Sequence, residues 1–469
     1  MRRKRDTQGW IDFQPSSLKL TNEYFGRYEA ISRILDDTPR LLDLVHGDLQ
    51  KALKSENRRR TRKGSFRITS EMVLRLSLCQ VIEGLSLREV VIRVDDSCYL
   101  RRFTRIHDGP MMNYTALCRL RNAIGPETWK KLNQALAQRG VERGEVSGAK
   151  LRLDTTAVET NIHWPTDSSL LWDGYRTLGR LIRAARDIDP QSVGDRRVHL
   201  GRAKKIATTI ARKTRVKGRK ARDVKSLYER LIRQVESICE WAAEVVPALE
   251  QGLRSQRYGL IDHARVEGLV VDFRRFEKLT RRVIGQSTAR VIEERSVPNA
   301  EKLFSIFEPH TELLKRGKAG KDIEFGHMIQ IQQVDGKFIT DFEVFAEKPA
   351  EPALLRPALS SHEKLFGYMP DQVTADKGYW SADHVDEIRA DIELVAIPKK
   401  GRRNSLEDER ELDPLFRLAQ AFRAGVEGSI SFLKRCLGLA RCMNKGWEHY
   451  RSAVGATVVA HNLLVLARC

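Results

Sequence analysis

Three acidic residues stand where a carboxylate could take part in catalysis. Asp154 ends the alternating stretch Leu-Arg-Leu-Asp, Asp376 ends the apolar stretch Val-Thr-Ala-Asp, and Glu427 lies in a segment with helical spacing. Hard divalent cations take oxygen ligands, and because Mg²⁺ keeps several waters, two or three carboxylates are enough to hold it. A pair of such ions activates an attacking oxygen and stabilises a leaving one. The three acids therefore indicate a metal-assisted phosphodiester site using Mg²⁺ or Mn²⁺.

Two cations accompany Glu427 along the expected helix. At 100° per residue, Arg423 and Lys434 fall on the same face as Glu427, and Gln420 joins them. Cations on this stripe would hold a phosphate backbone beside the metal. Each residue also has an ordinary explanation, since Arg423 and Glu427 could form a plain i to i+4 ion pair and the chain has 62 acidic residues. Only the combination favours a site.

Other basic and aromatic residues near the expected strand ends are candidates for DNA contact. Lys377, Tyr379 and Trp380 directly follow Asp376, and the two rings could stack on an unpaired base, although core packing is an equal alternative. A basic turn after a later expected strand is predicted to contact phosphates; it contains Lys399, Lys400, Arg402 and Arg403.

The composition narrows the class of partner. The chain has 469 residues and a net charge of +21, which predicts a polyanionic partner. The basic start has no apolar stretch behind it, and the apolar segment 452–467 is too short and too polar to span a bilayer. Seven scattered cysteines without a Cys-x-x-Cys pair disfavour disulfides and a standard zinc site. We therefore expect a cytoplasmic protein that binds nucleic acid and no membrane.

The elements before the first acid are expected to be helical. Residues 1–145 show helical spacing, and Gly84 followed by the capping box Ser86-Leu-Arg-Glu89 predicts a helix, a tight turn and a second helix. This pattern fits either a DNA-reading helix-turn-helix or an ordinary helical hairpin. In the first case the DNA phosphates would be contacted by Arg88, Arg93, Arg101, Arg102 and Arg105.

The acids themselves are expected on a sheet that a helical segment interrupts. Alternation predicts a strand over 150–158, after which helical spacing runs to about residue 299, with a strongly basic stretch over 202–233 that favours DNA contact. Strands near 323–331 and 338–345 flank an Asp335-Gly336 hairpin turn. Later strands near 372–376 and 393–397 alternate with helices, ending with helices over 414–436 and 452–467. The pattern predicts a mixed α/β sheet with a large helical insertion.

The three acidic blocks, taken in order, resemble a known family. Leu-Asp-Thr-Thr at 153–156, Ala-Asp-Lys-Gly-Tyr at 375–379, and the spacing of Arg423, Glu427 and Lys434 resemble the signature blocks of bacterial insertion-sequence DDE transposases. The segments 308–312 and 325–327 are similar to the ISNCY-type branch, and 71–136 to the N-terminal helical region of related transposases. The resemblance covers most of the chain. It departs at Gln420, where the related signature has a tyrosine.

The resemblance implies an RNase H-like catalytic fold with Asp154, Asp376 and Glu427 as the metal-binding triad and Arg423 and Lys434 as DNA contacts. It divides the chain into a DNA-end-binding region (1–145), a catalytic domain in two parts (146–165 and 321–469) and a basic helical insertion (166–320). It implies cleavage and joining of transposon DNA ends at the bacterial nucleoid, with terminal repeats and target DNA as partners, by a homodimer or larger assembly. The alternatives are an inactive DNA-binding derivative and a plain metal-dependent nuclease.

Overall fold

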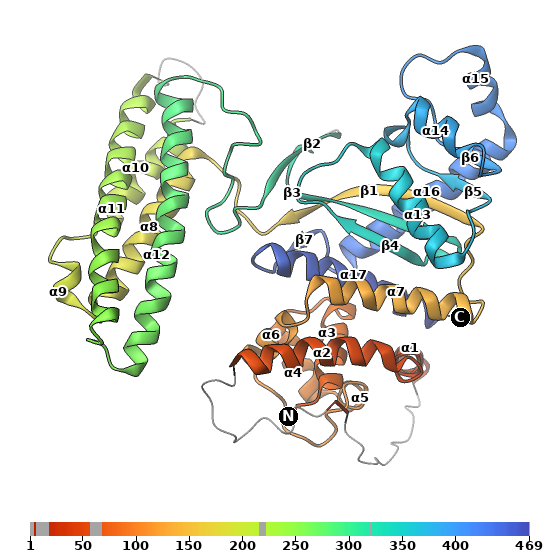
Figure 1. The fold of residues 1–469 in the computed structure, drawn as a ribbon, viewed down its shortest axis with the longest axis horizontal. Coiled ribbons are helices and arrows are strands. Elements are labelled where there is room, and N and C mark those ends of the chain that lie inside the picture. The colour runs from red at the N-terminus through yellow and green to blue at the C-terminus, as the bar shows by residue number, and fades with distance from the viewer. Residues whose placement is uncertain (1–3, 6–17, 57–67, 215–221, 319–320, 469) are drawn as a thin grey trace. The chain divides into compact units, whose positions relative to one another are not determined.

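The computed structural model describes residues 4–5, 18–56, 68–214, 222–318 and 321–468. The chain is a mixed α/β protein that forms two compact units (Figure 1). The first combines residues 1–161 with 326–469, and the second contains residues 162–325. Each unit has its own buried apolar core. In the described part of the chain, no helix combines the length and the apolar character needed to cross a bilayer.

The described residues form a mixed sheet of seven strands, with strand order β2-β3-β1-β5-β6, β4 beside β3 and β7 beside β1. All of it belongs to the first unit except β2 and the first residues of β3, which fall within 162–325. The strands are β1 (Lys150–Thr160), β2 (Glu312–Lys318), β3 (Lys321–Val334), β4 (Ile339–Val344), β5 (Gln372–Thr374), β6 (Leu394–Ala396) and β7 (Arg441–Cys442). The strand predicted over 150–158 and the hairpin at Asp335-Gly336 are confirmed, since β3 and β4 pair antiparallel and Gly336 has a φ of 68°. Strands β2 and β7 were not expected from the sequence.

Long helices pack on the strands of this unit. Helices α7 (Pro126–Glu142) and α17 (Trp447–Leu466) pack against each other and against β4, and α16 (Pro414–Arg435) contacts β1, β5 and β6. The sequence predicted α16 and most of α17 because of their apolar spacing. The unit also contains α13 (Leu355–Phe366), α14 (Ala382–Ile388) and the unexpected α15 (Ser405–Leu412).

Six further helices precede α7. They are α1 (Lys19–Asp36), α2 (Pro39–Glu56), α3 (Ser70–Ile82), α4 (Leu87–Asp96), α5 (Cys98–Phe103) and α6 (Tyr114–Asn122). The predicted helix, turn and helix are α3 and α4, and the capping box is confirmed because Ser86 and Glu89 satisfy each other's backbone N–H. Because α2, α3 and α17 share apolar contacts, these helices belong to the same compact unit as the sheet.

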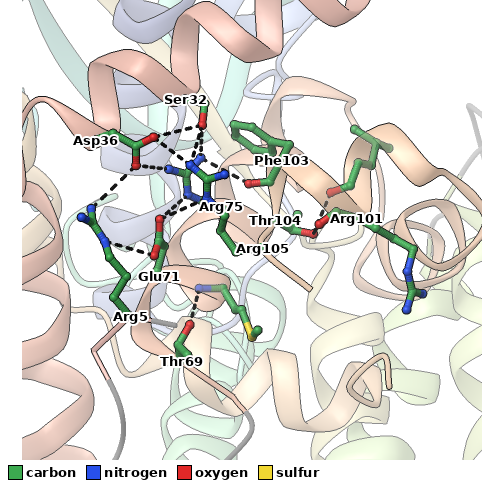
Figure 2. Close-up of polar contacts among 12 residues, drawn as sticks. Arg5, Ser32, Asp36, Thr69, Glu71, Arg75, Arg101, Phe103, Thr104 and Arg105 are labelled. Carbon is green, nitrogen blue, oxygen red and sulfur yellow. Dashed lines mark hydrogen bonds and ion pairs between the residues drawn. The ribbon is translucent and has the colours of Figure 1, made fainter. Parts of the chain in front are cut away.

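The buried guanidinium of Arg75 forms bonds to α1, to α3 and to the end of α5 (Figure 2). Arg75 on α3 is only 1% exposed, and its nitrogens reach Asp36 Oδ1 at 2.7 Å and Glu71 Oε1 at 3.0 Å. It also donates to the carbonyl oxygen of Phe103 at 3.2 Å. A buried charge needs this full set of partners to offset its lost hydration. The network therefore fixes how the N-terminal helices pack.

The second unit is mainly helical. It contains α8 (Asp167–Arg186), α9 (Pro190–Val193), α10 (Leu200–Lys213), α11 (Arg222–Arg254) and α12 (Leu260–Ser287). Helices α8, α11 and α12 pack on one another, and α10 packs on α8 and α11 (Figure 1). The sequence predicted helices here from their spacing, and their apolar faces form the second core.

Candidate active site

The sheet register brings two of the predicted acids to one level. β1 and β5 are parallel, and Arg152 on β1 pairs with Thr374 on β5. Asp154 lies two residues beyond Arg152, and Asp376 lies two residues beyond Thr374. Because neighbouring parallel strands advance in step, the two carboxylates lie at the same level, Asp154 within β1 and Asp376 just beyond the end of β5. The backbone turns directly after Asp376, whose Oδ1 accepts a hydrogen bond from the N–H of Gly378 at 2.8 Å.

The surroundings of Asp154 alter its acidity. Burial is the largest cause, and together with the negative charges of Asp376 and Glu427 it raises the pKa of Asp154 from 3.8 to about 6. A hydrogen bond from the N–H of Thr155 and the charge of Arg423 act in the opposite direction. All three predicted acids therefore interact electrostatically, although they come from β1, from the turn after β5 and from α16.

The close packing of α16 on β1 determines where Glu427 lies. Arg152, on the same face of β1 as Asp154, is buried; it donates to Gln333 Oε1 at 2.8 Å and to the carbonyl oxygen of Phe422 at 2.6 Å. Gly425 lies where a Cβ atom would stand 2.3 Å from Arg152 Nη1. The missing side chain therefore lets the helix approach the strand two residues before Glu427. Sequence reasoning did not single out Arg152 or Gly425, because neither carries a motif of its own.

Gln420 has a defined place at this site. Its Nε2 donates hydrogen bonds to the carbonyl oxygens of Ala375, at 3.3 Å, and of Ala396. Ala375 precedes Asp376, and Ala396 ends β6. The residue at the position of the signature tyrosine thus links α16 to the ends of two strands.

The two predicted cations on α16 differ in their surroundings. Arg423 approaches Glu427 at 3.4 Å, with its own side chain 20% exposed and that of Glu427 66% exposed. Its Nε is buried and has no hydrogen-bond partner among the described residues. Lys434 lies near the end of α16 and is half-buried. The plain ion pair considered from the sequence is therefore present, but it is long and leaves Arg423 with an unused donor facing an acidic site.

A fourth acid was missed by sequence reasoning. Glu351 accepts a hydrogen bond from the Thr155 hydroxyl at 2.7 Å, and a Cβ atom on Gly378 would meet its Oε2. Its charge, like those of Asp154 and Asp376, acts on the buried Tyr379. Glu351 begins a short 3-10 helix (Glu351–Leu354) in a stretch of Pro, Ala and Glu residues that gives no periodic signal, so only the folded chain places it here.

The two aromatic residues that follow Asp376 differ in how deeply they are buried. Tyr379 is 0% exposed, Gln330 donates to its hydroxyl at 3.3 Å, and burial raises its pKa far above the usual range. Of the two alternatives that the sequence left open, core packing and not stacking on a DNA base is therefore the one observed for Tyr379. Trp380 is half-buried, with the Lys399 ammonium 5.6 Å from its ring centre. Lys377 is exposed.

Some residues of the basic turn after β6 already have partners within the protein. Arg403 pairs with Glu411 at 2.6 Å and Asp408 at 3.2 Å, so its charge is already neutralised within the fold. The backbone N–H of Lys399 also donates to Glu411. Lys400 and Arg402 are exposed.

The arginines of the N-terminal helices that were predicted to contact phosphates also differ: some are paired within the fold, and others are exposed. Arg105 pairs with Asp36 at 2.7 Å, and Arg101 donates to the Asp95 carboxylate and to the carbonyl oxygens of His107 and Gly109. The prediction that these two contact phosphates is not supported, because they hold the fold together. Arg88 and Arg93 are exposed on α4.

The donor set suits a hard divalent cation, but the side chains are not gathered around one. Among the residues that the structure describes, no three His, Cys, Asp or Glu side chains are grouped closely enough to hold a metal ion. The raised pKa of Asp154 is caused first by burial and then by the negative charges of Asp376 and Glu427, and a bound cation would favour the ionised carboxylate. Asp154, Asp376 and Glu427 are hard oxygen donors of the kind that Mg²⁺ and Mn²⁺ prefer. In the fold as it stands, Glu427 faces Arg423.

Comparison with known proteins adds no relative. No protein-family model matches the chain, and neither a curated protein nor a solved structure matches it.

Proposed function

We propose that this chain is a DNA transposase that cleaves and joins DNA strands, with Asp154, Asp376 and Glu427 as its metal-binding acids on an RNase H-like sheet. The observation that carries the proposal is the raised pKa of Asp154, which is caused in part by the other two acids. Three carboxylates from separate elements share one electrostatic environment, and they are the acids that the signature blocks predict. A divalent ion held there would activate an attacking oxygen and stabilise the leaving one.

The remaining side chains have roles that follow from their contacts. Arg423 would bind the phosphate next to the scissile bond, because its buried Nε lacks an acceptor and its bond to Glu427 is long. Lys434 would contact the same strand from the end of α16. Gln420 and Arg152 would hold α16 in place without touching DNA, since both are bonded to backbone carbonyls. Exposed Arg88 and Arg93 on α4 would contact the terminal repeat.

The test is strand cleavage and joining on the DNA that flanks the coding region. Asp154→Asn, Asp376→Asn and Glu427→Gln keep the shapes of their side chains, and each is expected to lower Mg²⁺-dependent cleavage by at least about a thousandfold. Asp383→Asn is the matched control, because Asp383 is an exposed acid on α14. Cleavage that persists undiminished in the three variants would remove the assigned mechanism.

Two alternatives give different results in the same experiment. A plain metal-dependent nuclease would cut a labelled strand without producing a joined product from its 3′ end. An inactive DNA-binding derivative would bind the terminal repeats and cut nothing in either Mg²⁺ or Mn²⁺.

A further inference from the structure

A polar cavity of about 460 Å³ opens in the second, helical unit. Its walls come from α8, α10, α11 and the segment before α10. They are formed by Tyr175, Arg197, His199, Arg202, Arg230, Arg233, Gln234, Ser237, Ile238 and Trp241. The sequence predicted only a basic stretch here; the helix packing turns part of it into a concave site.

The cavity wall carries a concentrated positive charge. Four of its residues are arginines, and in this described part of the chain the lining contains no acidic residue. Arg197, Arg202 and Arg230 form no ion pair with any described residue. Among the residues that the structure describes, Arg233 donates only to a backbone carbonyl, that of Glu229, at 3.3 Å. The neighbouring Arg196, outside the lining, is by contrast paired with Glu244 at 2.7 Å.

The positions of these arginines are unfavourable without an anion. Arg230 and Arg233 are three residues apart on α11, so like charges stand next to each other on one helix face. Arg202 lies in the first turn of α10, which has no acidic residue in that turn. The helix dipole makes that end positive and therefore disfavours a cation there. A bound anion would relieve both conflicts at once.

The cavity also contains an unpaired polar atom. The amide oxygen of Gln234 is buried and has no hydrogen-bond partner among the described residues. A buried acceptor of this kind costs free energy until a water or a ligand donates to it. The site therefore suits a polar, hydrated ligand and not an apolar one.

We propose that this cavity binds two or more neighbouring phosphate groups, as carried by a DNA strand or by a nucleoside polyphosphate. Planar guanidinium groups match phosphate oxygens through paired hydrogen bonds. A volume of about 460 Å³ lies within the usual range for sites that enclose a small ligand. The proposal does not depend on the carboxylate site, because every lining residue belongs to the 162–325 unit.

The experiment uses the full chain with two probes. Inorganic tripolyphosphate binding is measured by calorimetry, and binding of a labelled DNA duplex by fluorescence anisotropy over a range of salt concentrations. The cavity variant is Arg230→Gln with Arg233→Gln, since glutamine keeps helix propensity and both side chains are exposed. Its control is Arg254→Gln with Lys278→Gln, which removes the same charge from exposed positions outside the cavity. Circular dichroism checks that both double variants fold.

The expected result is a loss of affinity of about tenfold or more for at least one probe in the cavity variant, compared with the control. If DNA is the ligand, the slope of log affinity against log salt also falls by about 2. A loss of affinity for tripolyphosphate alone would identify a nucleoside polyphosphate as the source of the bound phosphates. Equal losses of affinity in both double variants would overturn the proposal, because net charge alone would then explain binding. No loss in either would overturn it as well, because the cavity arginines would then not contribute to binding. Arg202→Gln, on a different helix, must act in the same direction as the cavity variant.

Discussion

Gln420 donates a hydrogen bond to the carbonyl oxygen of Ala375 at 3.3 Å. This bond joins the helix that carries Glu427 to the residue before Asp376, and a second bond from the same amide reaches the end of β6. The Gln420 side chain thus connects the elements that carry two of the three candidate metal ligands, Glu427 and Asp376. It does so at the position where the sequence departs from the transposase signature.

Gln420→Met should loosen this connection while keeping the size of the side chain. We expect a loss of about 1 to 3 kcal/mol of unfolding free energy, and cleavage reduced by about tenfold or more because Glu427 loses its fixed position. Arg417→Gln, an exposed change three residues earlier on α16, should alter stability by less than about 0.5 kcal/mol. Urea unfolding and single-turnover cleavage measure the two effects. Unchanged cleavage in Gln420→Met would mean that the amide does not position the site.

Gly425→Ala tests the close approach of α16 to β1. Alanine favours a helix by about 1 kcal/mol over glycine, yet its Cβ would stand 2.3 Å from Arg152 Nη1. Arg152 cannot easily yield, because it is buried and held by Gln333 and Phe422. We expect a net destabilisation of about 1 to 3 kcal/mol in urea unfolding.

Gly428→Ala, three residues along the same helix, is the matched control for that change. Nothing lies within 4 Å of its added Cβ, so this variant should be stabilised by up to about 1 kcal/mol. Stabilisation of both variants would show that the helix stands farther from the strand than the structure places it.

The raised pKa of Asp154 predicts how stability depends on pH without metal. Its carboxyl is protonated in both the folded and unfolded states below about pH 4. Its ionisation is penalised in the folded state as pH rises through the folded pKa of about 6. Asp154→Asn should therefore stabilise the metal-free chain at pH 8, by a free energy of about 3 kcal/mol, and have a much smaller effect at pH 4. Thermal unfolding at the two pH values checks this; a stabilisation that is the same at both would contradict it.

The same acid predicts a pH-dependent response to Mn²⁺. Carboxylates bind a cation in their ionised form, so the rise in unfolding temperature on adding Mn²⁺ should be large at pH 8 and small at pH 5. Asp154→Asn should lose most of that rise, while Asp383→Asn should keep it. A shift that is independent of pH would place Mn²⁺ binding elsewhere.

The buried network around Arg75 predicts a stability effect in the N-terminal helices (Figure 2). Arg75→Ala leaves the carboxylates of Asp36 and Glu71 short of a partner, and should cost about 3 to 5 kcal/mol. Arg93→Ala, an exposed arginine on α4, should change stability by less than about 0.5 kcal/mol. Denaturant unfolding followed by circular dichroism distinguishes the two.

Local patterns in the sequence were enough to predict the main elements and the three candidate acids. Alternation predicted the strand that carries Asp154, helical spacing predicted the helix that carries Glu427, and the capping box at Ser86 predicted the start of α4. These are local properties, since backbone periodicity and capping involve residues only a few positions apart. The resemblance then linked acids that lie far apart in the chain.

Which side chains meet depends on long-range packing, which the folded chain reveals. Strand register sets Asp376 level with Asp154, and packing buries Tyr379, which the sequence left open between the core and DNA. Glu351, the contact of Gly425 with Arg152, and the arginine-lined cavity have no local signal, because each joins segments from different elements. Periodicity assigns a residue to a face, but the neighbours that alter its pKa or fill its hydrogen bonds come from long-range packing.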